Sequence, residues 1–214
     1  MKYIILILIL LIASINLDSE ETKMLRKGLP MGVPIKSGIV TTTTLNGSGF
    51  YIISGYNMTE YPCKVNINNL FVGNADPFSS KSMLFNRPSA GTQVTVKPEI
   101  IDPNDPYANS YHLMQQIGQV SKINTFQMTA ALPGTFDTTA FNDYFFVFNV
   151  NQPCVVQITI NETRTNGMII NTTYNANVTS GMVLNYFIDE GSTLHYVVSS
   201  VSGSIATVDV YTFQ

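Results

Sequence analysis

The sequence predicts an all-β protein, in which two tandem antiparallel β-sandwich domains follow a signal peptide. Apolar and polar residues alternate with a period of two, helix-favouring stretches are almost absent, and one block of sequence recurs about 90 residues downstream. Short strands separated by Gly, Asn and Ser turns are typical of antiparallel sandwiches. We therefore expect a signal peptide at 1–16, a polar arm at 17–30, and β-sandwich repeats at 31–132 and 133–214.

The chain opens on a short apolar run. Lys2 precedes an unbroken apolar stretch over 4–12, and Ala13 and Ser14 lead into a polar, acidic stretch over 16–21. This order is typical of a secretory signal peptide. A membrane-spanning helix needs about 20 apolar residues, roughly twice the length of this run. The sequence therefore predicts a secreted, extracellular protein that is not inserted in the membrane.

The two halves share five short blocks in the same order. A Pro-Cys pair opens an alternating segment at Cys63 and again at Cys154. The last block aligns 111–114 with 194–197 and would place His112 and His195 at equivalent positions. An insertion over 100–108 accounts for most of the change in spacing. The other three blocks pair 38–42 with 134–138, 49–53 with 143–147, and 89–91 with 179–181.

The strands are clearest in the second half. The segment 155–160 alternates, Asn166-Gly167 predicts a hairpin turn, and 168–173 returns. Further strands are expected over 181–188, 194–198 and 205–213, which are rich in β-branched and aromatic residues.

One set of motifs resembles a known family. Leu132-Pro133-Gly134 with Thr138, then the aromatic run 142–148, then Pro153-Cys154 and the strand after it, together resemble the bacterial pre-peptidase C-terminal domain. The resemblance implies a jelly-roll-like β-sandwich that serves secreted proteins as an accessory or matrix-binding module. The Gly-x-Tyr of that family is present only as Gly203 and Tyr211, at a looser spacing.

Cys63 and Cys154 are the only cysteines. In an exported chain two cysteines normally form a disulfide. Because these two occupy equivalent positions, a bridge would join the two domains, and that requires the copies to pack about a pseudo-two-fold axis. Two buried free thiols, or a link between molecules, are the alternatives.

Five Asn-x-Ser/Thr sequons predict N-glycosylation if the chain follows a eukaryotic secretory route. They are Asn46, Asn57, Asn161, Asn171 and Asn177.

The insertion gathers oxygen-bearing side chains at Glu99, Asp102, Asn104 and Asp105. Calcium prefers such ligands, and calcium binding is known in relatives of the resembled family, so these four residues are a candidate calcium site. The same residue types are also ordinary turn formers. No other cofactor is predicted.

Catalytic motifs are missing from the sequence. It contains no Gly-x-Ser-x-Gly elbow, His-Glu-x-x-His helix, phosphate loop or Cys-x-x-Cys pair. His112 and His195 each lie in an alternating strand with no acid or nucleophile at a motif spacing, which favours a structural role. A net charge of -3 with 11 Lys and Arg residues argues against nucleic acid as a partner.

Tyrosines supply the remaining candidates for recognition, because an exposed ring can stack on a sugar or anchor a protein interface. We therefore favour a non-catalytic binding or adhesion module for an extracellular glycan, matrix or protein partner, in which two copies double the valency. The alternatives are a self-assembling protein of a coat or secretory granule, which would be a homo-oligomer, and an enzyme. The tyrosines concerned are Tyr51, Tyr56, Tyr61, Tyr107, Tyr111, Tyr144, Tyr174 and Tyr186.

Overall fold

The computed structural model describes residues 33–47 and 49–214. The signal peptide predicted at 1–16 and the arm predicted at 17–30 lie outside the described residues. The described part of the chain consists of strands joined by turns and contains no helix, so it offers no helix that could cross a membrane. The all-β fold class predicted from the alternating sequence is confirmed.

Fifteen strands follow one another along the described residues. The first half holds β1 (Val33–Lys36), β2 (Thr41–Thr44), β3 (Phe50–Asn57), β4 (Cys63–Ile67), β5 (Leu70–Ala75), β6 (Ser80–Asn86), β7 (Gln93–Ile100) and β8 (Tyr111–Met128). The second half holds β9 (Gly134–Thr138), β10 (Asn142–Val150), β11 (Cys154–Thr163), β12 (Ile169–Val178), β13 (Val183–Ile188), β14 (Thr193–Ser200) and β15 (Ala206–Phe213).

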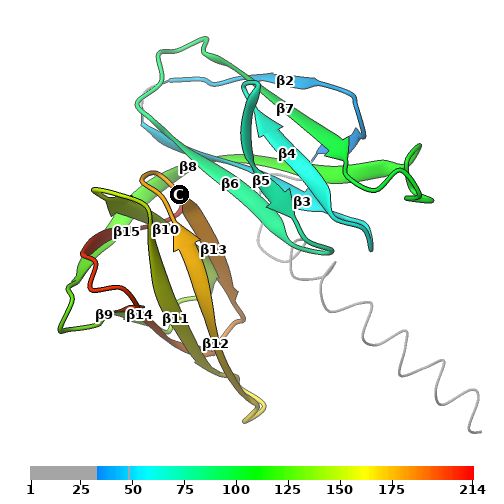
Figure 1. The fold of residues 1–214 in the computed structure, drawn as a ribbon. Coiled ribbons are helices and arrows are strands. Elements are labelled where there is room, and N and C mark those ends of the chain that lie inside the picture. The colour runs from blue at the N-terminus through cyan, green and yellow to red at the C-terminus, as the bar shows by residue number, and fades with distance from the viewer. Residues whose placement is uncertain (1–32, 48) are drawn as a thin grey trace, which may run out of the picture. The chain divides into compact units, whose positions relative to one another are not determined.

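The strands form three antiparallel sheets (Figure 1). Two four-stranded sheets have the orders β2-β7-β4-β5 and β12-β11-β14-β9, and a larger sheet has the order β1-β8-β15-β10-β13-β6-β3. Reading β2 to β8 against β9 to β15, each strand of the first half pairs as its counterpart in the second half does. The strand order of the first half therefore recurs in the second half.

The larger sheet closes on itself, because β3 pairs with β8 as well as with β6. Two strand pairings link the halves: β8 pairs with its counterpart β15, and β6 meets its counterpart β13 at Ser82 and Val183. Counterpart strands that pair antiparallel are the pattern of a two-fold relation between repeats.

Each sheet face that turns inward is apolar, and three clusters result. One fills the first sandwich around Ile53, Val65 and Val96, and a second fills the other sandwich around Phe146, Ile158 and Tyr196. The third lies among the strands of the closed sheet and contains Ile52, Val120, Phe145, Val147, Val183 and Tyr211. Alternation along each strand explains this, since one residue in two faces each side.

β8 serves both halves. Its residues 113–120 pair with β3, and its residues 120–128 pair with β15. The boundary predicted between residues 132 and 133 falls in the turn between β8 and β9. The division into 31–132 and 133–214 stays a prediction, because compactness places Gly32–Gln214 in a single unit.

For two of the five aligned blocks, the predicted equivalence is wrong, because the paired segments lie on strands that are not counterparts. His112 lies on β8 and His195 on β14, whereas the counterpart of β8 is β15. Gly91 precedes β7 and Gly181 precedes β13, which are also not counterparts. The reason is local: turns with a glycine of positive φ, as at Gly91, Gly181 and Gly191, recur between many alternating strands, so short blocks match out of place.

Candidate functional site

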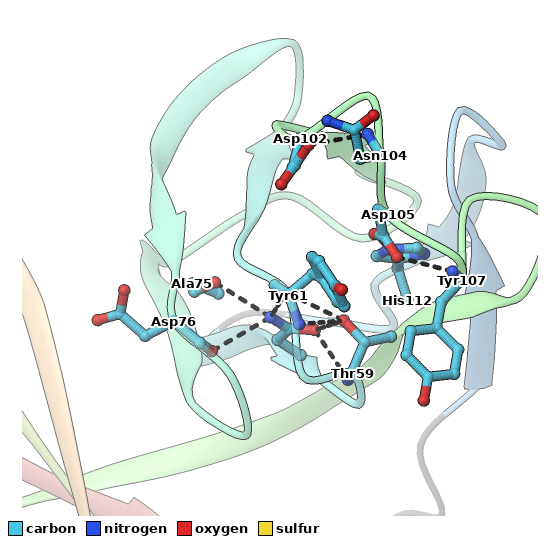
Figure 2. Close-up of polar contacts among 10 residues, drawn as sticks. Thr59, Tyr61, Ala75, Asp76, Asp102, Asn104, Asp105, Tyr107 and His112 are labelled. Atoms are coloured by element: carbon cyan, nitrogen blue, oxygen red, sulfur yellow. Dashed lines mark hydrogen bonds and ion pairs between the residues drawn. The ribbon is translucent and has the colours of Figure 1, made fainter.

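Asn57, the last residue of β3, holds together the loops at one end of the first sandwich. Its side chain is fully buried, and Nδ2 donates toward the carbonyl oxygens of Tyr61 at 2.7 Å, Ala75 at 3.1 Å and Asp76 at 3.2 Å. Its Oδ1 accepts from the N–H of Thr59 at 3.0 Å, which is an Asx turn. Figure 2 shows these hydrogen bonds as dashed lines among Thr59, Tyr61, Ala75 and Asp76. The backbone around Tyr61 is therefore fixed by buried hydrogen bonds.

Asp105 anchors the insertion between β7 and β8. Its Oδ1 accepts from the N–H of Tyr107 at 2.7 Å, and its Oδ2 lies 2.6 Å from His112 Nε2. Both side chains of the Asp105–His112 pair are inaccessible to solvent. The other ring nitrogen of His112, Nδ1, is buried and has no hydrogen-bond partner in the described residues, so the ring is held through Nε2 alone.

Two aromatic rings meet where these anchored loops come together. The rings of Tyr61 and Tyr107 have centroids 6.2 Å apart with their planes tilted by 59°. Tyr61 is half-buried, and Tyr107 is 38% exposed. Figure 2 draws both tyrosines together with Asp105, which accepts from the N–H of Tyr107. A buried polar side chain thus holds the backbone of each tyrosine, Asn57 that of Tyr61 and Asp105 that of Tyr107.

The residues of the predicted calcium site point in different directions. Glu99 accepts from Lys97 Nζ at 2.8 Å, and that hydrogen bond, with the charge of Lys97, lowers the pKa of Glu99. Asp102 Oδ1 accepts from the N–H of Asn104 at 2.8 Å, while Asp105 faces inward to His112. Within 33–47 and 49–214, no three His, Cys, Asp or Glu side chains gather as metal ligands. Calcium binding stays a prediction, and the Asx turns at Asp102 and Asp105 show these residues forming turns.

The inter-domain disulfide is absent from the structure. Cys63 and Cys154 are both free thiols. Cys63 is buried in the apolar cluster around Ile53 and Val65, and Cys154 is half-buried against the cluster around Phe146 and Ile158. They lie on β4 and β11, whereas the halves meet through β8, β15, β6 and β13. The physical reason is that equivalent residues of two repeats come together only near the two-fold axis, and β4 and β11 are not among the strands that join the halves. Burial, and then the charge of Asp105, raises the pKa of the Cys63 thiol to about 12, so it is no nucleophile.

The predicted sequons differ in accessibility. Asn46, Asn171 and Asn177 are exposed, and Asn161 is half-buried. Asn57 is fully buried with its amide nitrogen engaged, so a glycan at this position is incompatible with the fold. The prediction for Asn57 is therefore corrected, because a sequon motif is local and burial is not. Glycosylation at the other four stays a prediction.

A second polar feature lies on the outward face of the sheet β12-β11-β14-β9. His195 Nδ1 lies 2.6 Å from Asp137 Oδ1 of the neighbouring strand, and both side chains are exposed. They border a depression of about 490 Å³ lined by Asp137, Thr138, Thr139, Asn161, Thr163, Thr193, Leu194 and His195. The sequence missed both His–Asp pairs. The one between β9 and β14 depends on strand pairing, whereas the seven-residue spacing from Asp105 to His112 was visible but carries no known motif.

No family model matches the chain, so the resemblance to the pre-peptidase C-terminal domain is limited to the all-β fold. No curated protein matches either.

Solved structures show weak likeness. The CBM22-1-CBM22-2 tandem of Paenibacillus barcinonensis Xyn10C is 7% identical, with 86% of this chain and 85% of that one covered and a TM-score of 0.28. The PBSX exported protein XepA is 7% identical over 87% of this chain and 85% of its own, with a TM-score of 0.26. A Bacteroides uniformis beta-glucuronidase is 12% identical over 74% of this chain, which spans 21% of the enzyme, with a TM-score of 0.28. Likeness at these TM-scores gives no information about what this chain binds or does.

Proposed function

We propose that this chain is a secreted, non-catalytic binding module that recognises an extracellular glycan through Tyr61 and Tyr107. The observation that carries the proposal is the tyrosine pair itself, presented on two loops whose anchors, Asn57 and Asp105, are buried. Rings held in place by a rigid scaffold are the usual means by which a loop surface binds.

The composition of the chain favours a neutral glycan as the ligand. Charged residues make up 12% of the chain, and Thr, Ser and Asn abound. A tyrosine ring offers an apolar face to the C–H groups of a sugar and a hydroxyl to its polar groups. Neutral saccharides therefore suit this surface better than phosphates or acidic polymers do.

The site is monovalent in this proposal. The counterpart of the 58–62 loop is the shorter 151–153 segment, and the counterpart of the 101–110 insertion is the 201–205 turn, and neither contains a tyrosine. In this proposal the chain therefore carries one binding site and not the two equal sites that the sequence repeat suggested.

The two His–Asp pairs support binding over catalysis. Asp105 and His112 are sealed from solvent, so no substrate reaches them. Asp137 is 67% exposed, whereas the acid that orients a catalytic histidine is buried. Among the described residues, no hydroxyl or thiol is hydrogen-bonded to the His195 ring as an activated nucleophile would be.

A panel of immobilised neutral polysaccharides tests the proposal, with dissociation constants measured for each one bound. We expect Tyr107→Ala to weaken binding about tenfold or more, because the loss of one anchoring ring costs about 1.4 kcal/mol or more. Phe71→Ala is the matched control: it removes an exposed ring on the same sandwich, at the other end of the β4–β5 hairpin. If no polysaccharide in the panel binds, or if both variants weaken binding equally, the proposal is contradicted.

A further inference from the structure

Five strands of the described residues stand last in their sheets and pair with one neighbour only: β1, β2, β5, β9 and β12. A free edge presents unpaired N–H and C=O groups to which another strand can add, and proteins usually guard such edges. β1 has Pro34, Lys36 and a register shift; β2 has four residues; β9 has five and carries Asp137. The pairing of β5 with β4 is broken by a register shift after Val65.

β12 has none of these protective features: it is not short, and it lacks proline, charged residues and a register shift. It is ten residues long, contains no charged residue, proline or glycine, and pairs with β11 through ten consecutive residue pairs without a shift. Exposed apolar side chains accompany it: Met168 in the preceding turn, Ile169 at 70% exposed, and Tyr174. The longest regular edge in the described part of the chain is therefore also uncharged and partly apolar.

The hydrogen-bond pattern shows which groups of β12 face outward along the sheet. The N–H of Arg164 donates to Met168 O at 2.9 Å in the hairpin turn. In an antiparallel ladder, bonded and non-bonded pairs alternate. The even-numbered residues of β12 therefore bond to β11, and the odd-numbered residues, such as Asn171, Thr173 and Asn175, direct their N–H and C=O to the free edge.

We propose that β12 is the edge at which a second copy of this chain adds antiparallel, when Asn171 and Asn177 carry no glycan. The occupant is a second copy because an identical uncharged strand meets no charge repulsion and matches this edge in length. A two-fold pairing joins two isologous edges, so it closes as a dimer. Both sequons lie on β12 itself, at outward-bonding positions, so a glycan at either one would obstruct the incoming strand.

The full chain, exported in a bacterial host that attaches no N-glycans, tests the proposal. Sedimentation velocity across a wide range of concentration should show the mass doubling as concentration rises. Hydrogen exchange at high concentration should protect the amides of Asn171, Thr173 and Asn175, and dilution should release them. A monomer at every concentration, or a dimer that leaves these amides unprotected, overturns the proposal.

A matched pair of variants separates main-chain pairing from side-chain contacts. Asn175→Pro removes an N–H that faces the free edge and leaves the β11 ladder intact, so the dimer should be lost. Asn175→Ala removes the same side chain but keeps the N–H, so the dimer should persist. A folded Asn175→Pro that still dimerises overturns the proposal, and if this variant does not fold, the exchange result on the unaltered chain decides.

Discussion

Asn57 has a structural role that its sequon motif conceals. Its amide nitrogen is directed at three carbonyl oxygens, and its oxygen accepts from both the N–H and the hydroxyl of Thr59. The residue thus satisfies backbone groups that would otherwise be buried without partners. Removing one partner of a buried hydrogen bond costs about 1–3 kcal/mol, more when a charge takes its place.

We predict that Asn57→Asp strongly destabilises the protein, by about 3 kcal/mol or more, because a carboxylate cannot donate to the three carbonyl oxygens and brings a buried charge. Denaturant unfolding measures the change. Asn46→Asp is the control, since Asn46 is exposed and should shift stability by less than about 0.5 kcal/mol. Equal effects from the two substitutions would contradict the role given to Asn57.

Among the elements, β8 is the strand that pairs with both halves. One stretch of it pairs with β3 and the next with β15, so it must accept close neighbours from both halves. A Cβ at Gly118 would overlap the ring of Phe213, which packs edge-on against Phe145 with ring centroids 5.1 Å apart. Glycine is therefore required at this point by close packing and not by a turn.

We predict that Gly118→Ala destabilises the protein by about 2 kcal/mol, because the added methyl forces the Phe213 ring out of its place. In a Phe213→Ala background the same change should cost much less, since the obstructing ring is gone. A double-mutant cycle measured by denaturant unfolding gives the coupling. If the two costs simply add, the contact between Gly118 and Phe213 does not explain the glycine.

At the scale of the whole molecule, the third apolar cluster ties the halves together. It draws Ile52 and Val120 from the first half and Phe145, Val183 and Tyr211 from the second. Cutting the chain at the predicted boundary would expose these side chains and leave β15 without its partner β8. Neither half then buries its apolar surface as fully as the intact chain does.

We predict that residues 133–214 alone fail to give the cooperative thermal transition of the full chain, and that they bind a hydrophobic dye. The full chain should unfold in a single calorimetric transition, because the shared cluster couples both sandwiches. Circular dichroism and calorimetry on the two chains measure this. A sharp transition of 133–214 near the midpoint of the full chain would show that the halves are independent.

The fold class was within reach of the sequence, because a period of two and frequent turn residues are local properties. The repeat was visible for the same reason, as in the segments that open at Cys63 and Cys154. Local likeness also misled, since it paired His112 with His195, which lie on strands that are not counterparts.

The candidate site was predictable only in part. Tyr61 and Tyr107 were named as aromatic candidates, and the acids of the insertion as calcium ligands. That Asp105 turns inward to His112, that Asn57 is buried, and that the two rings meet depends on loops from distant parts of the chain. No local pattern encodes such contacts.

By itself the sequence determined that this chain folds into strands, that those strands repeat, and which side chains lie on the same face of a strand. Only the tertiary structure decided that the repeats share a closed sheet through β8, that the two thiols stay apart, and that β12 keeps a free edge. The physical reason is range. Alternation acts between neighbouring residues, whereas sheet closure, burial and edge exposure depend on which strands meet once the chain has packed.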